Sequence, residues 1–204
     1  MPRGWTWAGR ASTRLRALGL GILVVLCLPG CGGGGGGDDS DPVICTNLAF
    51  DSVLFTPADG DVYFEEGTST CTSLEVSVLV SNLSGIWTVG FDLTYPTTLL
   101  QYDSYSLGPL LQKGSPVSPL FYNVSPIAGG LQVLLSRFAP DPPVAAVGSE
   151  ELLTLRFKRI GPGAAAIDFN TGGGSIVSES ILDDGGLPRP AVFAPGHGGM
   201  VTVP

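Results

Sequence analysis

The sequence of 204 residues has little of what most enzymes and nucleic-acid-binding proteins need. It contains a single histidine, His197, and 10 Lys and Arg residues against 18 Asp and Glu residues. His197 stands in the stretch PGHGG, which is typical of a solvated turn rather than of a general base. The sequence also has no Gly-x-Ser-x-Gly nucleophile motif. These shortages predict a protein that is not an enzyme.

A hydrophobic run long enough to cross a membrane is also missing. The longest apolar stretch, residues 17–28, has twelve residues, whereas a spanning helix needs about 20. The residues before it include four arginines and no acidic residue, and small residues follow it. This order is typical of a secretory signal peptide, so we expect residues 1–30 to be one and the protein to be exported.

The end of this segment reads Leu28-Pro29-Gly30-Cys31 and resembles the lipobox of bacterial lipoproteins. The resemblance implies that Cys31 is lipidated and becomes the first residue of the mature chain. The alternative is ordinary cleavage nearby, which leaves a free thiol. Acyl chains bind membranes firmly, because each buried methylene contributes roughly 0.8 kcal/mol. Gly32, in place of the Asp that retains lipoproteins in the inner membrane, favours the outer membrane or the cell surface.

Residues 31–43 have the composition of a flexible tether. Six consecutive glycines, Gly32–Gly37, precede the acidic stretch DDSD, and polyglycine is the most flexible backbone available. A phosphate-binding loop is not indicated, because no Lys-Ser/Thr pair follows the glycines. Removal of residues 1–30 leaves a chain with six Lys and Arg residues against 18 Asp and Glu residues, which is a net charge of −12. This negative charge argues against nucleic acid and anionic membrane surfaces as partners, so we expect membrane contact through the lipid anchor only.

Residues 44–204 are long enough for one folded domain, and they contain only two cysteines, Cys45 and Cys71. Export places them in an oxidising compartment, so we expect a disulfide. It would close a loop of about 27 residues, worth roughly 3.5 kcal/mol on the chain-entropy model. A metal pair is the alternative, although two cysteines and one histidine do not make a structural zinc site.

Composition and alternation in this domain indicate an all-β fold. The whole chain combines 30 glycines and 17 prolines with 44% hydrophobic residues, which is typical of short strands joined by turns. The alternation is clearest in WTVGFDLTY (87–95). We therefore predict an antiparallel β-sandwich of about nine or ten short strands. The candidate strands are residues 48–55, 74–80, 87–95, 99–107, 120–124, 131–138, 152–158, 164–169, 176–182 and 199–203.

The order of these strands resembles that of cohesin domains over residues 48–203. The motifs that carry the resemblance are Val76 to Gly85, Trp87 to Tyr95 with Pro96 and Leu99 or Leu100, Gly130-Leu-Gln-Val-Leu-Leu, and Leu152 to Lys158. The resemblance implies a nine-stranded jelly-roll sandwich. It also implies that one flat face binds a dockerin, a small calcium-loaded module on another protein. Carbohydrate-binding modules of the same jelly-roll type share parts of this pattern.

The cohesin resemblance and the alternation together predict a binding face. It would comprise the exposed side of strand 87–95 and of its neighbour 131–138. Where cellulosomal cohesins carry Asn and Asp on the first of these strands, this chain has Thr88 and Gly90, and Pro96 directly follows Tyr95. The predicted face consists of Thr88, Gly90, Asp92, Thr94, Gln132, Leu134 and Ser136.

Two other functions and one cofactor remain open from the sequence. A carbohydrate-binding module of the cell envelope would use exposed aromatics, for which Tyr102, Tyr105 and Tyr122 are the candidates. A structural envelope lipoprotein without a ligand is the other alternative. Calcium is the open cofactor, because Asp59, Asp61, Glu65 and Glu66 lie close together, but their spacing does not match an EF-hand and favours a charged hairpin.

Overall fold

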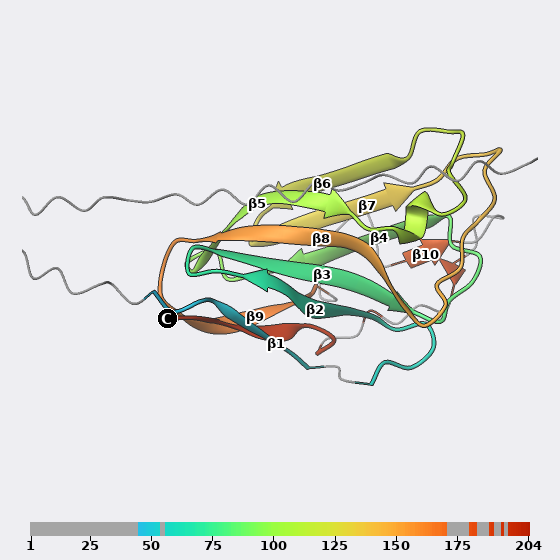
Figure 1. Ribbon diagram of the computed structural model, residues 1–204. Helices are drawn as coiled ribbons and strands as arrows, with labels where there is room; N and C mark the ends of the chain where they lie inside the picture. The colour runs from blue at the N-terminus through green and yellow to red at the C-terminus, as the bar shows by residue number, and fades with distance from the viewer. Residues whose placement is uncertain (1–44, 54–55, 171–179, 183–187, 190–192, 194–195) are drawn as a thin grey trace, which may run out of the picture. The chain divides into compact units, whose positions relative to one another are not determined.

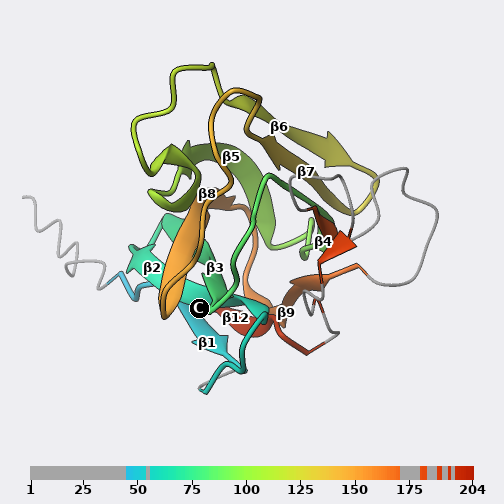
Figure 2. The same cartoon turned by 90° about the vertical axis from the view of Figure 1, so that its right-hand side faces the viewer.

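The computed structural model describes residues 45–53, 56–170, 180–182, 188–189, 193 and 196–204. The predicted signal peptide, Cys31 and the whole linker to residue 43 lie outside the described residues. The described part belongs to a compact unit, Val43–Pro204, in which two antiparallel β-sheets face each other (Figures 1 and 2). No helix in this part is long and apolar enough to span a membrane.

One sheet has four strands, and β3 and β8 form its centre. Their inner side chains are the apolar members of two alternating sequences, such as Val76 and Val78 on β3 and Leu155 and Phe157 on β8, all of them fully buried. The strand order is β2 (Val62–Ser69), β3 (Ser73–Ser81), β8 (Ser149–Arg159) and β5 (Leu100–Leu107).

The second sheet is built around β4 (Thr88–Thr94). β4 pairs along its whole length with β7 (Gly130–Ser136), and β7 pairs in turn with β6 (Phe121–Ile127). On its other side, β4 pairs with β9 near Thr94 and with β10 near Thr88. The remaining strands of this sheet are β1 (Ala49–Ser52), β12 (Gly199–Val203), β9 (Gly163–Phe169), β10 (Ser180–Leu182) and β11 (Pro188–Arg189).

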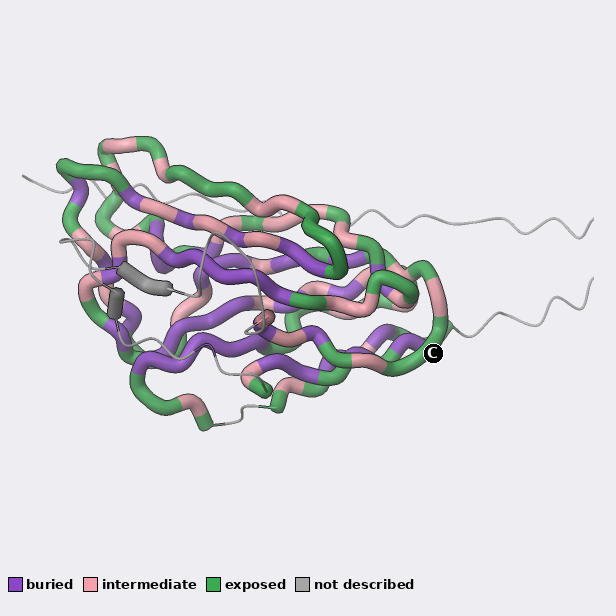
Figure 3. The backbone as a smooth tube through the Cα atoms, turned by 180° about the vertical axis from the view of Figure 1, so that it is seen from behind, coloured by how far each residue is buried: buried purple, intermediate pink, exposed green. Residues whose placement is uncertain are grey.

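Aromatic side chains fill the space between the two sheets. The Phe64 ring stacks on the Phe169 ring with centroids 4.4 Å apart, and Phe91 meets Phe169 edge to face at 5.4 Å. Phe193 contacts both Phe91 and Phe169. Burial of such large rings is the main favourable term in folding, at about 25 cal/mol per Å² of apolar surface. Figure 3 shows the resulting pattern, with buried segments along many of the strands and exposed segments at turns and along some outer strands.

A disulfide joins Cys45 to Cys71, with an S–S distance of 2.07 Å. This is the pairing expected from the two cysteines of an exported chain. It fixes the start of the described chain to the turn between β2 and β3, where the Leu48 N–H also donates to the Thr70 carbonyl over 2.9 Å.

The predicted fold class, an all-β antiparallel sandwich, is confirmed. The described residues contain twelve strands, because each of the ten expected strands has a counterpart and two further strands, β2 and β11, were not expected. The longer of these two is β2, whose second half (EEGTS) is polar, so its sequence does not show the alternation expected of a strand that buries Val62 and Phe64. Of the expected strand 176–182, residues 176–179 lie outside the described residues.

We expect the substitution Phe91→Ala to lower the free energy of unfolding by about 3–5 kcal/mol, because it removes a ring from the centre of a close-packed core. Urea unfolding monitored by circular dichroism measures the change. Val117→Ala is the control, since the Val117 side chain is exposed, and we expect it to change stability by no more than about 0.5 kcal/mol. Equal effects of the two substitutions would contradict the described core.

Removal of the disulfide in the double variant Cys45→Ser/Cys71→Ser should lower the free energy of unfolding by roughly 3.5 kcal/mol, because the unfolded chain regains loop entropy. The comparison is made by urea unfolding of the oxidised protein and the variant. If the oxidised protein and the variant unfold at the same urea concentration, the pairing contributes nothing to stability.

Candidate protein-binding face

The predicted face lies on two strands that are hydrogen-bonded neighbours, β4 and β7. Thr88 stands opposite Ser136, Gly90 opposite Leu134, and Asp92 opposite Gln132. The side-chain oxygens of Thr88 and Ser136 are 2.7 Å apart and share a hydrogen bond. These residues alternate with fully buried ones, so they lie on the outer side of the sheet.

Two of the seven predicted residues, Gly90 and Asp92, are buried rather than exposed. Both residues lie where β4 has a hydrogen-bonded neighbour along each of its edges. β10 pairs with it at Gly90, and the Asn170 N–H, just beyond β9, donates to the Asp92 carbonyl oxygen over 2.9 Å. Of the other predicted residues, Thr94 is exposed and the rest are half-buried: Thr88, Gln132, Leu134 and Ser136.

The Asp92 side chain has an unusual environment. It is 2% exposed, and neither carboxylate oxygen has a hydrogen-bond partner. A buried carboxylate without a donor is unfavourable, because it loses water and gains nothing in return. Asp92 is therefore a polar group that folding alone does not satisfy, in the middle of the candidate face.

The third strand of the face, β6, was not predicted as part of it. The register places Phe121 opposite Ser136, Asn123 opposite Leu134, and Ser125 opposite Gln132, so these β6 side chains share the outer side. Phe121 is 44% exposed and Ile127, at the other end of β6, is 38% exposed. We call the outer side of these three strands the β6–β7–β4 face.

A second exposed phenylalanine extends this face beyond the end of β7. Phe138 is 48% exposed, and its ring lies edge to face against Phe121 with centroids 6.4 Å apart. Together with Ile127 and Leu134, these rings give the face an apolar character. The sequence contains a signal for this feature only in the two phenylalanines, and their proximity depends on the pairing of β6 with β7.

The loop next to the phenylalanine pair is held by two buried charged residues that follow β7. Arg137 is fully buried, and its guanidinium donates to the backbone carbonyls of Leu111 and Lys113. Asp141 accepts hydrogen bonds of 2.8 Å from the backbone N–H groups of Val117 and Ser118. The Val117 N–H, then that of Ser118 and the charge of Arg137, lower the pKa of Asp141 below its usual range.

The tyrosines that were candidates for a carbohydrate platform do not form a flat surface. Tyr102 packs against Phe157 with ring centroids 6.2 Å apart, and burial raises the pKa of Tyr102 to about 12. Tyr105 and Tyr122 contact each other with their ring planes 62° apart. Only Tyr122 is largely exposed.

Of the acidic residues considered for calcium, two accept hydrogen bonds within or next to a turn, and one lies apart from that turn on a strand. The Asp61 carboxylate accepts from the Ala58 N–H over 2.6 Å, and the Asp59 carboxylate accepts from the Asn82 amide over 2.8 Å. Glu65 lies on β2 opposite Ser77. In the part of the chain that the structure describes, no three His, Cys, Asp or Glu side chains are grouped so as to hold a metal ion.

Comparison with known proteins identifies the fold of this chain but does not assign its sequence to a family. No family model matches the chain, and no curated protein matches it. A solution structure of CaCohA2 from Clostridium acetobutylicum matches with a TM-score of 0.51 and 15% identity, over 71% of this chain and 92% of that one. The fold is cohesin-like.

Two further solved structures agree with this assignment. CaCohA2 in a crystal structure of its complex with CaDoc0917 matches with a TM-score of 0.53 and 12% identity, over 71% of this chain and 99% of that one. A type II cohesin domain from the cellulosome of Acetivibrio cellulolyticus matches with a TM-score of 0.50 and 13% identity, over 71% and 94% of the two chains. At such identities the cohesin likeness concerns the fold alone.

The lowered pKa of Asp141 predicts a pH dependence of stability. Its carboxylate stabilises the folded state fully above the unfolded pKa of about 3.9, and this contribution is lost as the pH falls through the lower folded pKa. We therefore expect Asp141→Asn to be less stable than the wild type at pH 6, with the difference shrinking below about pH 4.

The measurement is the urea midpoint of both proteins as a function of pH. Asp51→Asn is the matched control, because Asp51 is an exposed carboxylate on β1. A difference between wild type and Asp141→Asn that stays constant down to the lowest pH would show that the charge of Asp141 does not hold the loop.

Proposed function

We propose that this protein is a surface-tethered, non-enzymatic binding module that recognises another protein through the β6–β7–β4 face. The observation that carries the proposal is the apolar outer side of this face. Nine large hydrophobic side chains are markedly exposed in the described residues, and three of them, Phe121, Ile127 and Phe138, lie on or beside β6 and β7 on this one face. Clustered exposed apolar groups are typical of interaction sites.

The shape of the face supports a protein as the partner. Three adjacent strands offer a broad surface, which suits an interface that must bury roughly 800 Å² on each partner. Exposed aromatic rings are also the side chains that contribute most to such interfaces. The cohesin-like fold supports a dockerin-bearing partner in particular, since one matching structure is a complex of CaCohA2 with CaDoc0917.

The details of recognition would differ from those that the cohesin resemblance implies. Gly90 and Asp92 are buried, so the outer surface of β4 contributes less than the resemblance suggests. The apolar groups of β6 and β7 take the larger part, with Phe121 and Phe138 as the anchors.

The cellular location of the protein is part of the same proposal. It comprises a signal peptide at residues 1–30, a lipidated Cys31 with a linker to residue 43, and export to the outer membrane or the cell surface. The lipobox-like end of the apolar segment and the glycine-rich linker support it. A module that is anchored and exported in this way would hold its protein partner at the envelope.

The test uses the mature chain to capture proteins from the culture fluid of its source, with and without calcium. Captured proteins are identified, purified and titrated directly against the wild type and Phe121→Ala. We expect a dockerin-bearing partner and a loss of affinity of about 30-fold for Phe121→Ala, as for an aromatic hot spot worth about 2 kcal/mol.

Ile160→Ala is the control, because Ile160 is also an exposed apolar residue but follows β8 on the other sheet. We expect it to bind the partner like the wild type. Equal affinity of Phe121→Ala and the wild type would place the interface elsewhere. Failure to capture any dockerin-bearing protein, combined with binding to a glycan array, would replace the proposal with the carbohydrate-binding alternative.

A further inference from the structure

The cationic side chains of this acidic protein are concentrated in one place. Among the described side chains, Lys113 is paired with Glu150 and Arg137 is buried beneath its loop. The other three cations line one hollow of about 390 Å³ at the outer side of the four-stranded sheet. Its lining consists of Thr72, Ser73, Asp103, Arg156, Lys158 and Arg159.

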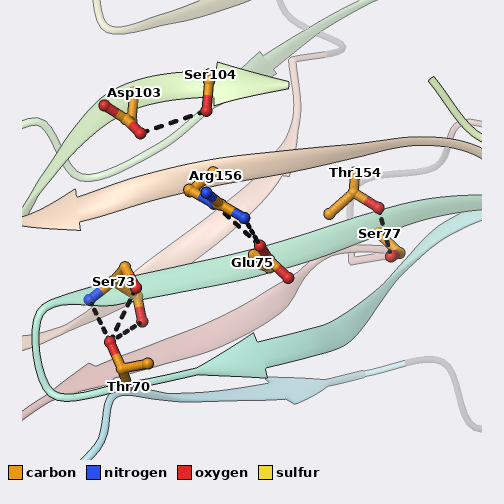
Figure 4. A network of polar contacts seen from close by, with 8 residues as sticks. All are labelled: Thr70, Ser73, Glu75, Ser77, Asp103, Ser104, Thr154 and Arg156. Atoms are coloured by element: carbon orange, nitrogen blue, oxygen red, sulfur yellow. Dashed lines mark hydrogen bonds and ion pairs between the residues drawn. The ribbon is translucent and has the colours of Figure 1, made fainter. Parts of the chain in front are cut away.

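The cations of this hollow are held only by weak surface pairs. Arg156 pairs with Glu75 (Figure 4). Lys158 pairs with Asp103, and the Arg156 and Lys158 side chains remain 53% and 60% exposed. Arg159 donates to the carbonyl of Pro204. Exposed ion pairs contribute little, about 0–1 kcal/mol, so a stronger anion can compete for these groups.

Hydroxyl groups complete a donor set for an oxyanion. Ser73 lies directly opposite Lys158 across the β3–β8 pair, and its hydroxyl contacts that of Thr70 over 2.8 Å. Thr72 precedes it in the same turn. Guanidinium, ammonium and hydroxyl donors around one hollow are the groups that bind phosphate oxygens.

The hollow lies at the end of the domain where the chain enters. Cys45 is bonded to Cys71, the residue before Thr72, and the Arg159 N–H donates to the Thr72 carbonyl over 2.9 Å. Figure 1 shows the start of the described chain, the β2–β3 turn and the C-terminus together at one end. Cys31 precedes Cys45 by fourteen residues, which for a flexible glycine-rich chain spans about 20 Å.

We propose that this hollow binds the phosphate group of an anionic lipid headgroup and seats the domain on the bilayer that holds its anchor. The proposal rests on the lipidation of Cys31 that forms part of the proposed function. The net charge of −12 repels an anionic membrane, so the hollow acts only at the high effective concentration that the tether provides. Because the anionic lipid repels the acidic remainder of the protein surface, the domain favours the orientation in which the hollow faces the lipid.

The experiment uses the mature chain purified from its membranes and reconstituted into vesicles. One set contains phosphatidylcholine alone, and the other contains phosphatidylcholine mixed with phosphatidylglycerol. Hydrogen–deuterium exchange measures how fast the backbone amides of residues 70–73 and 156–160 exchange with solvent. We expect these amides to exchange more slowly in the phosphatidylglycerol vesicles, and the remaining strands to exchange equally in both.

The variant Arg156→Gln/Lys158→Gln should lose this lipid-dependent protection. Each cation near an anionic surface changes the association constant by about fivefold, so the double variant should weaken association of the hollow with anionic lipid by roughly 25-fold. Lys113→Gln is the matched control, because it removes a cation that does not line the hollow. Equal protection in the double variant and the wild type would overturn the proposal.

The same vesicles distinguish a failure of the anchor from a failure of the phosphate seat. If the chain washes off phosphatidylcholine vesicles, it lacks the lipid anchor, and the proposed tether is refuted. If the chain stays anchored but its amides exchange equally in both kinds of vesicle, only the proposed phosphate binding is refuted. Protection by inorganic phosphate but not by phosphatidylglycerol would identify a free-anion site and overturn the membrane seat. If exchange in phosphatidylcholine vesicles quickens on Asp38→Asn/Asp39→Asn/Asp41→Asn, the linker occupies the hollow and the proposal fails.

Discussion

The packing of two sheets across one aromatic core is the constraint on which the other features of this protein depend. Phe64, Phe91 and Phe169 meet between the sheets, and their contacts fix which side of β2, β4 and β9 faces inward. Because successive side chains on a strand point to opposite sides, the choice of inner residues also sets the outer ones. The candidate binding face is thus a consequence of core burial, since a one-residue slip of β4 would exchange Thr88 and Asp92 for Val89 and Phe91.

The outer sides of the two sheets have different chemistry. The β6–β7–β4 face carries exposed apolar groups and only the buried Asp92 as a charge. The opposite sheet carries ion pairs between neighbouring strands, such as Arg156 on β8 with Glu75 on β3. Apolar surface favours association with another folded protein, whereas exposed cations near a strand end favour an oxyanion. The two proposals therefore assign a protein partner to one sheet and a phosphate group to the other.

The cohesin-like fold is shared with proteins to which this sequence has little similarity. A β-sandwich needs apolar residues at alternate positions and turns between strands, and many sequences satisfy these conditions. Partner choice depends instead on the outer residues, which the core does not restrict. Thr88 and Gly90 stand where the cohesin resemblance implies Asn and Asp, and Phe121 and Phe138 add apolar groups beside them.

The sequence by itself determined the features that depend on local pattern. The alternation in residues 87–95 and 152–158 was sufficient to predict two central strands and their buried sides, and the signal-peptide-like start together with two cysteines was sufficient to predict the Cys45–Cys71 pair. Only the tertiary structure decided which strands are neighbours. Burial of Asp92, contact of Phe121 with Phe138 and convergence of Arg156 with Thr72 each join residues far apart in the chain, because strand pairing and sheet packing act between segments that no local pattern relates.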